Sequence, residues 1–483
     1  MYTQLAAIDL FSGKPEFYTP AVIGCSPGKP FCFRVPVTGT RPIRLTAEGL
    51  PDGMHLDAAI PAVVGCAKAG IYEIRLSAEN TDGKTETQLS LNVRENGVCP
   101  TPLLGWTSWN AFRNLVSDAD IRNTAALLVK SGLADCGYRY VNIDSGWQGE
   151  YGGPHNALMP NEKFPDMRAL ADTLHAEGLC LGIYSSPMTK AWGGGEYPGC
   201  TRNPDRVLRL GVFGEERCEA ENVRQWCDWQ IDYLKYDWTP CNRENAEPMK
   251  QALACAARDF AFCVTVDARY HQAEYWRENV NSFRNNPDSA DDWSVFCPIL
   301  CSADRWLCHI RPGHFFDLDM LETAYYIDHR SHLTEDEQIA AFTARAFLSS
   351  PIQMSFDLNH LEPFDINVMA NPEILALNQD VTGVTAITMQ ETKTDSLSIW
   401  TRVYSRPTAD GNTAFALFNL GEQEAEIKVS LGAPCRIRDL WARKTLDQVI
   451  LENEEMGCCY DGFDGTFTAK LMPHTVRVIK TVR

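Results

Sequence analysis

Short apolar runs alternate with amphipathic helical stretches through the middle of this chain, from Thr101 to Asp380. Such alternation is typical of parallel βα units, and eight units in roughly 250 residues fit a closed (β/α)8 barrel better than an open sheet. We therefore predict a TIM barrel over residues 99–380. Its strands are expected to begin near Leu103, Tyr138, Cys180, Asp232, Phe260, Asn281, His314 and Pro351.

Helix-capping patterns support this placement. Ser117 is followed three residues later by Asp120, and Thr334 by Glu337 in front of the run IAAFTARAFL. Both spacings allow reciprocal hydrogen bonds between side chain and backbone at a helix N-terminus. Gly178 follows ADTLHAE and is expected to end that helix, because glycine readily adopts the left-handed conformation of a C-terminal cap.

The two ends of the chain have strand patterns without helices. Residues 1–98 contain alternating runs at 31–37, 44–47, 71–78 and 86–93, which favours a small β-sandwich. Residues 381–483 predict a closing antiparallel β domain, in which AFALFNLGEQEAEIKVSL is expected to form a hairpin. The predicted fold class is therefore multidomain, with an α/β barrel between two all-β domains.

Charge and composition exclude several classes of partner. The chain has 44 Lys and Arg against 63 Asp and Glu, and this net charge of -19 repels nucleic acid and anionic lipid alike. No apolar window reaches ~18 residues, and MYTQLAAIDLF lacks the features of a secretion signal. We expect no nucleic-acid or membrane partner. The chain as it stands reads as cytoplasmic, or as secreted or periplasmic if a leader has been removed.

The 18 cysteines are scattered and form no pair of CxxC motifs, which argues against a structural zinc site. Without a signal segment, free buried thiols are expected, although a removed leader would make disulfides possible.

Carboxylates that end apolar runs are the first candidates for chemistry, because catalytic groups of barrels lie at the carboxyl ends of the strands. In IDYLKYDW, alternation places Tyr233, Lys235 and Asp237 on one face. An ammonium beside a carboxylate lowers the pKa of the carboxyl group and keeps it ionised, as a carboxylate nucleophile requires. The alternative is a salt-bridged strand end without catalytic function.

A second carboxylate ends the run YRYVNIDSGW. Tyr140, Asn142 and Asp144 share one face, and Trp147 follows closely. A carboxylate beside an aromatic ring suits a sugar, because the hydroxyls need acceptors and the C–H face needs a flat apolar surface. Asp144 could equally cap a helix.

The segment SFRNNPDSADDW holds Arg284, Asp288, Asp291 and Asp292. Such an acidic cluster could be a solvated loop, but its position after the sixth predicted strand puts it on the face where the other carboxylates converge. A second carboxylate facing Asp237 would complete the pair that glycoside hydrolysis requires, and a separation near ~5 Å would imply retention of configuration.

Eight stretches of the chain form a recognisable series. They are LLGWTSWNAF, YVNIDSGW, LGIYSSP, DYLKYDW, FRNNPDSADDW, GHFFDLDML, FLSSPIQMSFDL and NPEILALNQD. Together they resemble glycoside hydrolase family 27, which contains retaining α-galactosidases and α-N-acetylgalactosaminidases, and they occur in the family order over nearly all of residues 100–483. The segment LTAEGLPDGMHLD and the strands after it resemble an immunoglobulin-like module that precedes the catalytic part of many bacterial glycoside hydrolases.

The resemblance implies a role for individual residues. Asp237 matches the nucleophile, and Asp288 matches the acid/base, whose pKa is expected to lie above that of Asp237 because one carboxyl must be protonated while the other is ionised. The remaining matches are to sugar-binding positions. Lys235 and Arg284 match cations, Trp109 an aromatic wall, Asp144 an acid that holds the O4 and O6 edge, Asp267 the residue that reads the 2-position, and Tyr184 a pocket member.

Three departures from the family pattern put strict galactose specificity in question. Ser145 replaces the second of two adjacent acids, which would weaken the grip on the 4-OH or 6-OH by about 1–3 kcal/mol. Trp192 stands in a loop that lacks the family cysteine, so Cys241 cannot form the family disulfide, and Trp192 is either a subsite wall or a packed surface residue. Phe315, Phe316 and Leu318 replace Trp, Asn and Pro, which predicts a more apolar mouth.

The remaining patterns predict no cofactor and no metal. His329 and His332 lie three residues apart without a third ligand spaced with them, and no phosphate-binding glycine motif occurs. We expect a retaining exo-glycosidase for a terminal α-linked galactose in an oligosaccharide or glycoconjugate. The alternatives are a β-L-arabinopyranoside, a 6-substituted galactoside or an α-N-acetylgalactosaminide as substrate, or a catalytically silent carbohydrate-binding protein. The sequence leaves the oligomeric state open.

Overall fold

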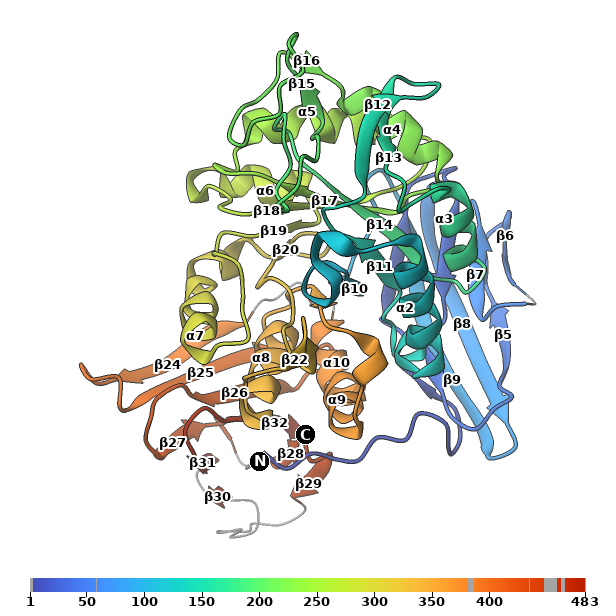
Figure 1. Cartoon of the computed structure of the whole chain (residues 1–483). Helices are drawn as coiled ribbons and strands as arrows, with labels where there is room; N and C mark the ends of the chain where they lie inside the picture. The colour runs from blue at the N-terminus through green and yellow to red at the C-terminus, as the bar shows by residue number, and fades with distance from the viewer. Residues whose placement is uncertain are drawn as a thin grey trace.

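The computed structural model describes residues 3–57, 59–380, 382, 386–433, 435–446, 458–461 and 465–482. The blue N-terminal strands flank one side of the central barrel, and the orange and red C-terminal strands lie beneath it (Figure 1). This arrangement confirms the predicted fold class. The limits of the individual domains stay predictions, although the described helices and the parallel strands of the barrel fall between Leu104 and Asn378.

The central sheet has eight parallel strands whose spatial order follows the chain, with the last strand beside the first. The ring closes where Leu321 forms a parallel bridge with Met354. All eight strands begin within two residues of their predicted starts. They are β10 (Leu104–Thr107), β11 (Tyr140–Ile143), β14 (Cys180–Ser185), β17 (Tyr233–Asp237), β18 (Ala261–Thr265), β19 (Ser282–Phe283), β20 (Phe315–Phe316) and β23 (Ile352–Met354).

Helices and small hairpins surround these strands, so a strand such as β14 is buried along its whole length. The three hairpins are β12 (Gln148–Gly152) with β13 (Ala157–Pro160), β15 (Thr201–Arg202) with β16 (Glu216–Arg217), and β21 (Tyr325–Tyr326) with β22 (His329–Arg330). The α-helices are α1 (Trp109–Phe112), α2 (Asp118–Lys130), α3 (Met167–His175), α4 (Glu219–Asp228), α5 (Arg243–Ala254), α6 (Ala273–Asn279), α7 (Trp293–Ser302), α8 (Glu335–Phe347), α9 (Pro363–Met369) and α10 (Pro372–Asn378).

The predicted capping patterns are confirmed. Ser117 and Asp120 form a reciprocal capping box at the start of α2, and Thr334 and Glu337 form another at the start of α8. Gly178 has a φ of +71° shortly after α3. These local interactions determine the residues at which α2 and α8 begin and α3 ends.

The N-terminal strands form two facing sheets around a small core of their own. One sheet has the order β2-β9-β8-β5 and the other the order β3-β7-β6, while β1 pairs with β4. These strands are β1 (Glu16–Phe17), β2 (Val22–Cys25), β3 (Phe31–Arg34), β4 (Val37–Thr38), β5 (Arg44–Glu48), β6 (Met54–Leu56), β7 (Ala62–Gly65), β8 (Gly70–Asn80) and β9 (Gly83–Val93).

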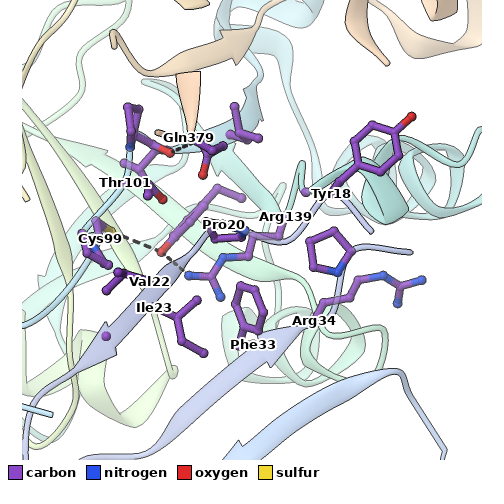
Figure 2. Close-up of a pocket in the computed structure, with 18 of the residues that line it drawn as sticks. Tyr18, Pro20, Val22, Ile23, Phe33, Arg34, Cys99, Thr101, Arg139 and Gln379 are labelled. Atoms are coloured by element: carbon purple, nitrogen blue, oxygen red, sulfur yellow. Dashed lines mark hydrogen bonds between the residues drawn. The ribbon is translucent and has the colours of Figure 1, made fainter. Parts of the chain in front are cut away.

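This β-sandwich docks on the amino ends of the barrel strands (Figure 2). Arg139, which precedes β11, donates to the carbonyl of Cys32 at 2.9 Å and to the Tyr140 hydroxyl at 3.2 Å, and its guanidinium lies 5.4 Å from the Phe33 ring centroid. The cavity beside Arg139, between the two parts, has a volume of about 50 Å³. The module therefore covers the end of the barrel opposite to the carboxyl ends of the strands.

The C-terminal strands form a six-stranded and a three-stranded antiparallel sheet. The predicted hairpin around Asn419 is wrong, because β26 pairs with β25 and β32 whereas β27 pairs with β31. The Asn419 amide donates to the carbonyls of Gln423, Leu471 and Met472, and this connection crosses between the sheets. The strands are β24 (Ile387–Lys393), β25 (Trp400–Pro407), β26 (Thr413–Asn419), β27 (Ala425–Ser430), β28 (Arg436–Asp439), β29 (Lys444–Leu446), β30 (Cys458–Asp461), β31 (Thr466–Leu471) and β32 (Val476–Val482).

None of the helices in the described ranges combines the length and the apolar character that a membrane span needs. Within the same ranges, no disulfide joins the cysteines between Cys25 and Cys435, and Cys241 is a buried thiol.

Candidate active site

The carboxyl ends of the barrel strands open into a cleft of about 750 Å³. It brings together side chains from strands, loops and the short helix α1, as expected for a barrel whose loops carry the functional groups. The predicted site residues that line it are Trp109, Asp144, Ser145, Tyr184, Trp192, Lys235, Asp237, Arg284 and Asp288.

Asp237 is the last residue of β17, and its two carboxylate oxygens have different surroundings. The Tyr184 hydroxyl donates to Oδ2 at 2.8 Å. Oδ1 is buried and accepts no hydrogen bond from the residues that the structure describes. Buried polar atoms are normally paired, so an unpaired carboxylate oxygen on a residue that lines a cleft marks that carboxylate as a candidate partner for a ligand.

Burial raises the pKa of Asp237 to about 6, although the charges of Lys235 and Arg284 and the Tyr184 hydrogen bond lower it. The expectation that Lys235 would leave Asp237 with a low pKa is therefore wrong. The cation acts in the expected direction, but removal of the carboxylate from water has the larger effect.

Lys235 instead pairs directly with Asp144. Its ammonium lies 2.8 Å from Asp144 Oδ2 and 5.6 Å from the Tyr184 ring centroid. Burial lowers the pKa of Lys235, but Asp144 and Asp237 outweigh this effect and raise it above its ordinary value. The ammonium therefore stays charged and provides a fixed donor between two carboxylates of the cleft.

Arg284 connects the other side of the cleft. Its guanidinium donates to Asp288 Oδ1 at 2.7 Å and forms an ion pair with Asp319. The Arg284 side chain is 4% exposed, whereas that of Asp288 is 78% exposed. The Asp288 carboxylate therefore lies in the open part of the cleft, where the buried Arg284 guanidinium holds it.

Asp319 is a site residue that the sequence reasoning missed. Besides pairing with Arg284, its Oδ2 accepts the backbone N–H of Ser289 at 2.7 Å, so it holds the loop that carries Asp288. Although burial opposes it, Arg284 and Lys235 keep the pKa of Asp319 below its ordinary value. The sequence contained a signal for Asp319, because this carboxylate closely follows the apolar strand β20 within GHFFDLDML.

Ser145 contacts the loop that carries Trp192, and its predicted contact with the sugar stays a prediction. Its hydroxyl donates to the backbone carbonyl of Trp192, and its backbone N–H donates to Asp144 Oδ1 at 2.8 Å. The Trp192 ring lines the cleft and is 37% exposed, which favours the subsite-wall interpretation over packing. Ser145 thus holds the tryptophan loop against the end of β11.

Two expectations fit the structure less well. Asp267 is not among the cleft residues and pairs with Arg269 at 3.3 Å, so its role at the sugar 2-position stays a prediction, while its neighbour Val266 lines the cleft. The apolar mouth predicted from the strand-seven substitutions is wrong: these side chains are buried in the core, where they complete the barrel packing. They are Phe315, Phe316 and Leu318.

The sequence reasoning also missed a cation at the edge of the cleft. Arg113 follows α1, and its guanidinium lies 5.2 Å from the Trp109 ring centroid and 5.9 Å from that of Tyr326. No motif identified it, because its position depends on the tight turn after α1. The other cleft residues beyond the predicted set are Asn114, Gly193, Gly194, Thr239, Val266 and Met320.

Comparisons with known proteins identify the family of this chain. A family model described as alpha galactosidase A matches residues 101–380, and one described as the alpha galactosidase C-terminal beta sandwich domain matches residues 400–481. An α-galactosidase from Coffea arabica is 31% identical over 377 residues, which cover 75% of this chain and 92% of that protein. Alpha-galactosidase 2 from Arabidopsis thaliana is 29% identical over 368 residues, covering 73% and 86%.

Among solved structures, a protein from Bacteroides fragilis NCTC 9343 with a provisional α-galactosidase/melibiase name matches with a TM-score of 0.85 and 26% identity, covering 98% of this chain and 99% of that one. The match therefore includes the N-terminal β-sandwich. α-Galactosidase I from Mortierella vinacea shares the fold with a TM-score of 0.67 and 24% identity over 80% of this chain and 98% of that one. The chain thus belongs to the alpha galactosidase A family and is a glycoside hydrolase of the α-galactosidase type.

Proposed function

We propose that the protein is a retaining exo-glycosidase that removes a terminal α-linked galactose by double displacement, with Asp237 as nucleophile and Asp288 as acid/base. The observation that carries the proposal is the unpaired Oδ1 of Asp237 in a cleft that Asp288 also lines. A carboxylate oxygen with no other partner is free to attack a bound sugar, and the second carboxyl supplies the proton that the leaving group needs.

In the first step, Asp237 attacks the anomeric carbon while the bond to the aglycone breaks, and Asp288 gives its proton to the leaving oxygen. A covalent glycosyl ester forms at Asp237. In the second step, a water molecule attacks the anomeric carbon, Asp288 accepts its proton, and Asp237 leaves as a carboxylate. The 2.7 Å contact from Arg284 stabilises the carboxylate that Asp288 becomes after the first proton transfer.

The surroundings of the two acids suit a pyranose. Lys235, Asp144 and Arg284 supply charged donors and acceptors for hydroxyl groups, and Trp109 and Trp192 supply flat apolar surfaces. The cleft of about 750 Å³ has room for one sugar and part of the group attached to it. The relatives named as α-galactosidases favour galactose as that sugar.

A second candidate is the same chemistry on a related sugar with a change at C5, O6 or C2. The Ser145 hydroxyl already donates to the Trp192 carbonyl, so it does not replace a charged acceptor for the 4-OH or 6-OH. A β-L-arabinopyranoside, which lacks C6, a 6-substituted galactoside or an α-N-acetylgalactosaminide are the substrates to compare. A family 27 protein from Geobacillus stearothermophilus with this fold is named a β-L-arabinopyranosidase.

The substrate is tested by the release of p-nitrophenol from the α-galactoside, the α-N-acetylgalactosaminide and the β-L-arabinopyranoside. We expect the highest kcat/KM on the α-galactoside. A higher value on the arabinoside would favour the second candidate.

The mechanism is tested by the anomer that forms first and by azide rescue of two variants. Proton NMR of the α-galactoside reaction should show α-galactose before mutarotation. Azide should restore turnover of Asp237→Ala with a β-galactosyl azide product, and of Asp288→Ala with an α-galactosyl azide product, because the two variants leave opposite faces of the sugar open. Initial release of β-galactose by the wild type would contradict double displacement.

A further inference from the structure

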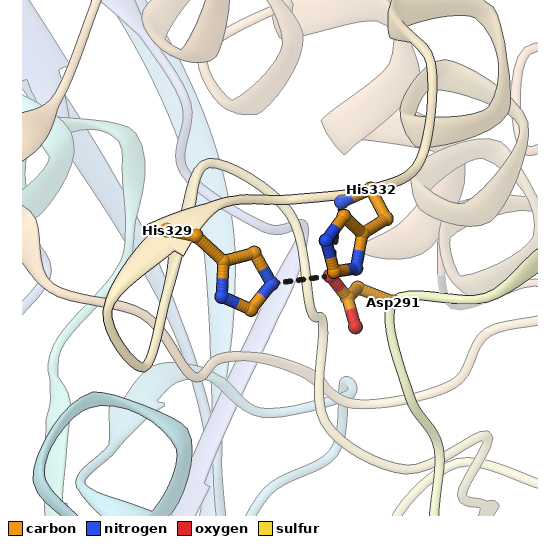
Figure 3. Close-up of side chains that lie close together, drawn as sticks. All are labelled: Asp291, His329 and His332. Atoms are coloured by element: carbon orange, nitrogen blue, oxygen red, sulfur yellow. Dashed lines mark hydrogen bonds and ion pairs between the residues drawn. The ribbon is translucent and has the colours of Figure 1, made fainter.

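A carboxylate and two imidazoles from separate segments meet at one point outside the catalytic pair. Asp291 Oδ2 lies 3.1 Å from His329 Nε2 and 3.1 Å from His332 Nδ1. Figure 3 shows both rings turned toward this carboxylate. Among the described residues, this is the group of three whose candidate ligand atoms all lie within 4.8 Å of one another. The sequence reasoning named all three residues but not their association, because 38 positions separate Asp291 from His329.

The donor set and its spacing suit a divalent transition metal ion of the Zn²⁺ type. Imidazole nitrogens with one carboxylate oxygen are characteristic Zn²⁺ ligands, whereas Ca²⁺ and Mg²⁺ prefer oxygen ligands alone. Ligands at ~2.1 Å from a tetrahedral ion lie about 3.4 Å from one another. The 3.1 Å separations between the Asp291 oxygen and each imidazole nitrogen are close to this value, and all three ligand atoms lie within 4.8 Å of one another, so local adjustment of the side chains can bring them to one ion.

Further contacts orient the ligands. Asp328 Oδ1 lies 3.0 Å from His329 Nδ1, which leaves Nε2 directed at the cluster. The backbone N–H of His332 donates to Asp291 Oδ2 at 2.9 Å, and the two rings are stacked with centroids 4.2 Å apart. A carboxylate on the far nitrogen of a histidine is a frequent feature of metal sites, because it fixes the ring and its tautomer.

The cluster combines a buried ligand with an open side. The Asp291 side chain is 10% exposed, that of His329 33% and that of His332 74%. An ion can therefore enter from the solvent next to His332. Three protein ligands also leave the fourth position of a tetrahedral ion for water.

The position of the cluster links it to the cleft. Asp291 is three residues after Asp288, at the end of the loop that Arg284 begins. His329 belongs to β22, and its ring lies 5.5 Å from that of Tyr326 in β21, which in turn contacts the cleft residue Arg113. We propose that Asp291, His329 and His332 bind a Zn²⁺-type ion that fastens the loop carrying Asp288 to the β21–β22 hairpin.

Direct titration tests this site without any use of activity. The full chain is treated with a chelator, its exposed thiols are alkylated so that Cys66, Cys255 and Cys308 do not bind metal, and Zn²⁺ is added in a calorimeter. We expect His332→Ala to lose one Zn²⁺ equivalent or to bind it ~10-fold or more weakly than the wild type. His332 is largely exposed, so this variant should fold normally. His271→Ala, which removes an exposed histidine elsewhere, is the matched control.

Two further measurements make the test specific. Asp328→Asn keeps all three ligands and should still weaken Zn²⁺ binding by ~10-fold. Zn²⁺ should raise the Tm of the wild type and of His271→Ala but not that of His332→Ala, because an ion that binds only the folded state stabilises it. Equal Zn²⁺ stoichiometry and affinity in the wild type and His332→Ala, or displacement of the ion by equimolar Ca²⁺, would overturn the proposal. Inactivity on every glycoside would leave this result unaffected.

Discussion

The two ends of the barrel use buried charges in opposite ways. At the amino ends, Arg34 donates to Asp135 at 2.9 Å, and the cavity beside Arg139, between module and barrel, is about 50 Å³. At the carboxyl ends, the cleft of about 750 Å³ is lined by Asp237, whose buried Oδ1 accepts no hydrogen bond from a described residue. Paired charges join two parts of the chain at one end, while an unpaired charge is kept for chemistry at the other.

This difference predicts that charge removal has opposite consequences at the two ends. At the cleft end, Asp237→Asn should lower kcat by about 10⁴-fold or more, because loss of a nucleophile removes the covalent route. The same change should raise stability near pH 7.5, since burial raises the pKa of Asp237 to about 6 from the ordinary 3.8. A shift of this size corresponds to about 3 kcal/mol.

The sign of this effect gives a pH test. The raised pKa makes the folded state bind a proton more tightly, so the ionised carboxylate destabilises the fold above pH 6, and this cost disappears as the pH falls from about 6 toward 3.8. Denaturant unfolding of the wild type and Asp237→Asn across this range measures it. A variant less stable than the wild type above pH 6 would contradict the assignment of an uncompensated buried charge.

At the amino end, Asp135→Asn should reduce stability by about 3 kcal/mol and leave kcat/KM on the preferred glycoside unchanged in the surviving folded protein. The change leaves the Arg34 guanidinium, 6% exposed, without its carboxylate partner, and unpaired buried charges are costly. Chemical denaturation provides the measurement. Glu79→Gln is the matched control, because its pair with Arg44 is 51% to 77% exposed and should contribute under ~1 kcal/mol.

The residues of the carboxyl-end cleft could be predicted well from the sequence, because a residue at the end of a barrel strand lies at the same end of the barrel as the ends of the other strands. Asp144, Tyr184 and Asp237 each lie within one residue of the end of an apolar strand, and all three line the cleft. The partner of each charge was harder to predict. Alternation along β17 put Lys235 next to Asp237, yet the ammonium bonds to Asp144 at the end of another strand.

The remaining errors have the same physical origin. The run through Asn419 alternates as a hairpin should, but local alternation does not specify which of two sheets a strand joins. Asp319 and the association of Asp291 with His329 depend on loops that follow different strands. Contacts between loops come from tertiary packing, which period and spacing in one segment do not encode.

A smaller effect is expected from loss of the hydrogen bond that Tyr184 donates to Asp237. Because Tyr184 donates to Asp237 and lowers its pKa, Tyr184→Phe should move the acid limb of the kcat/KM profile to a pH above about 6. The loss of activity should be largest near pH 6, where the variant has a smaller share of ionised Asp237, and much smaller at pH 7.5. Tyr325→Phe, which removes a phenol bonded to the Asp328 carbonyl, is the control, and an unmoved acid limb in Tyr184→Phe would show that another group governs it.

The smallest effect is expected at Ser145. Its hydroxyl joins two segments at the carboxyl end of the barrel, as the Arg34–Asp135 pair joins two parts of the chain at the amino end. Ser145→Ala removes the hydrogen bond to the Trp192 carbonyl and should cost about 1 kcal/mol of stability. If Ser145 only holds the Trp192 loop, kcat should stay within a few-fold of the wild type while KM rises, because the aromatic wall loses its fixed position but the Asp237 pair does not change. Steady-state kinetics with unfolding curves separates these effects, with Ser396→Ala in the C-terminal domain as control. A fall in kcat with KM unchanged would instead indicate that the Ser145 hydroxyl contacts the sugar in the transition state.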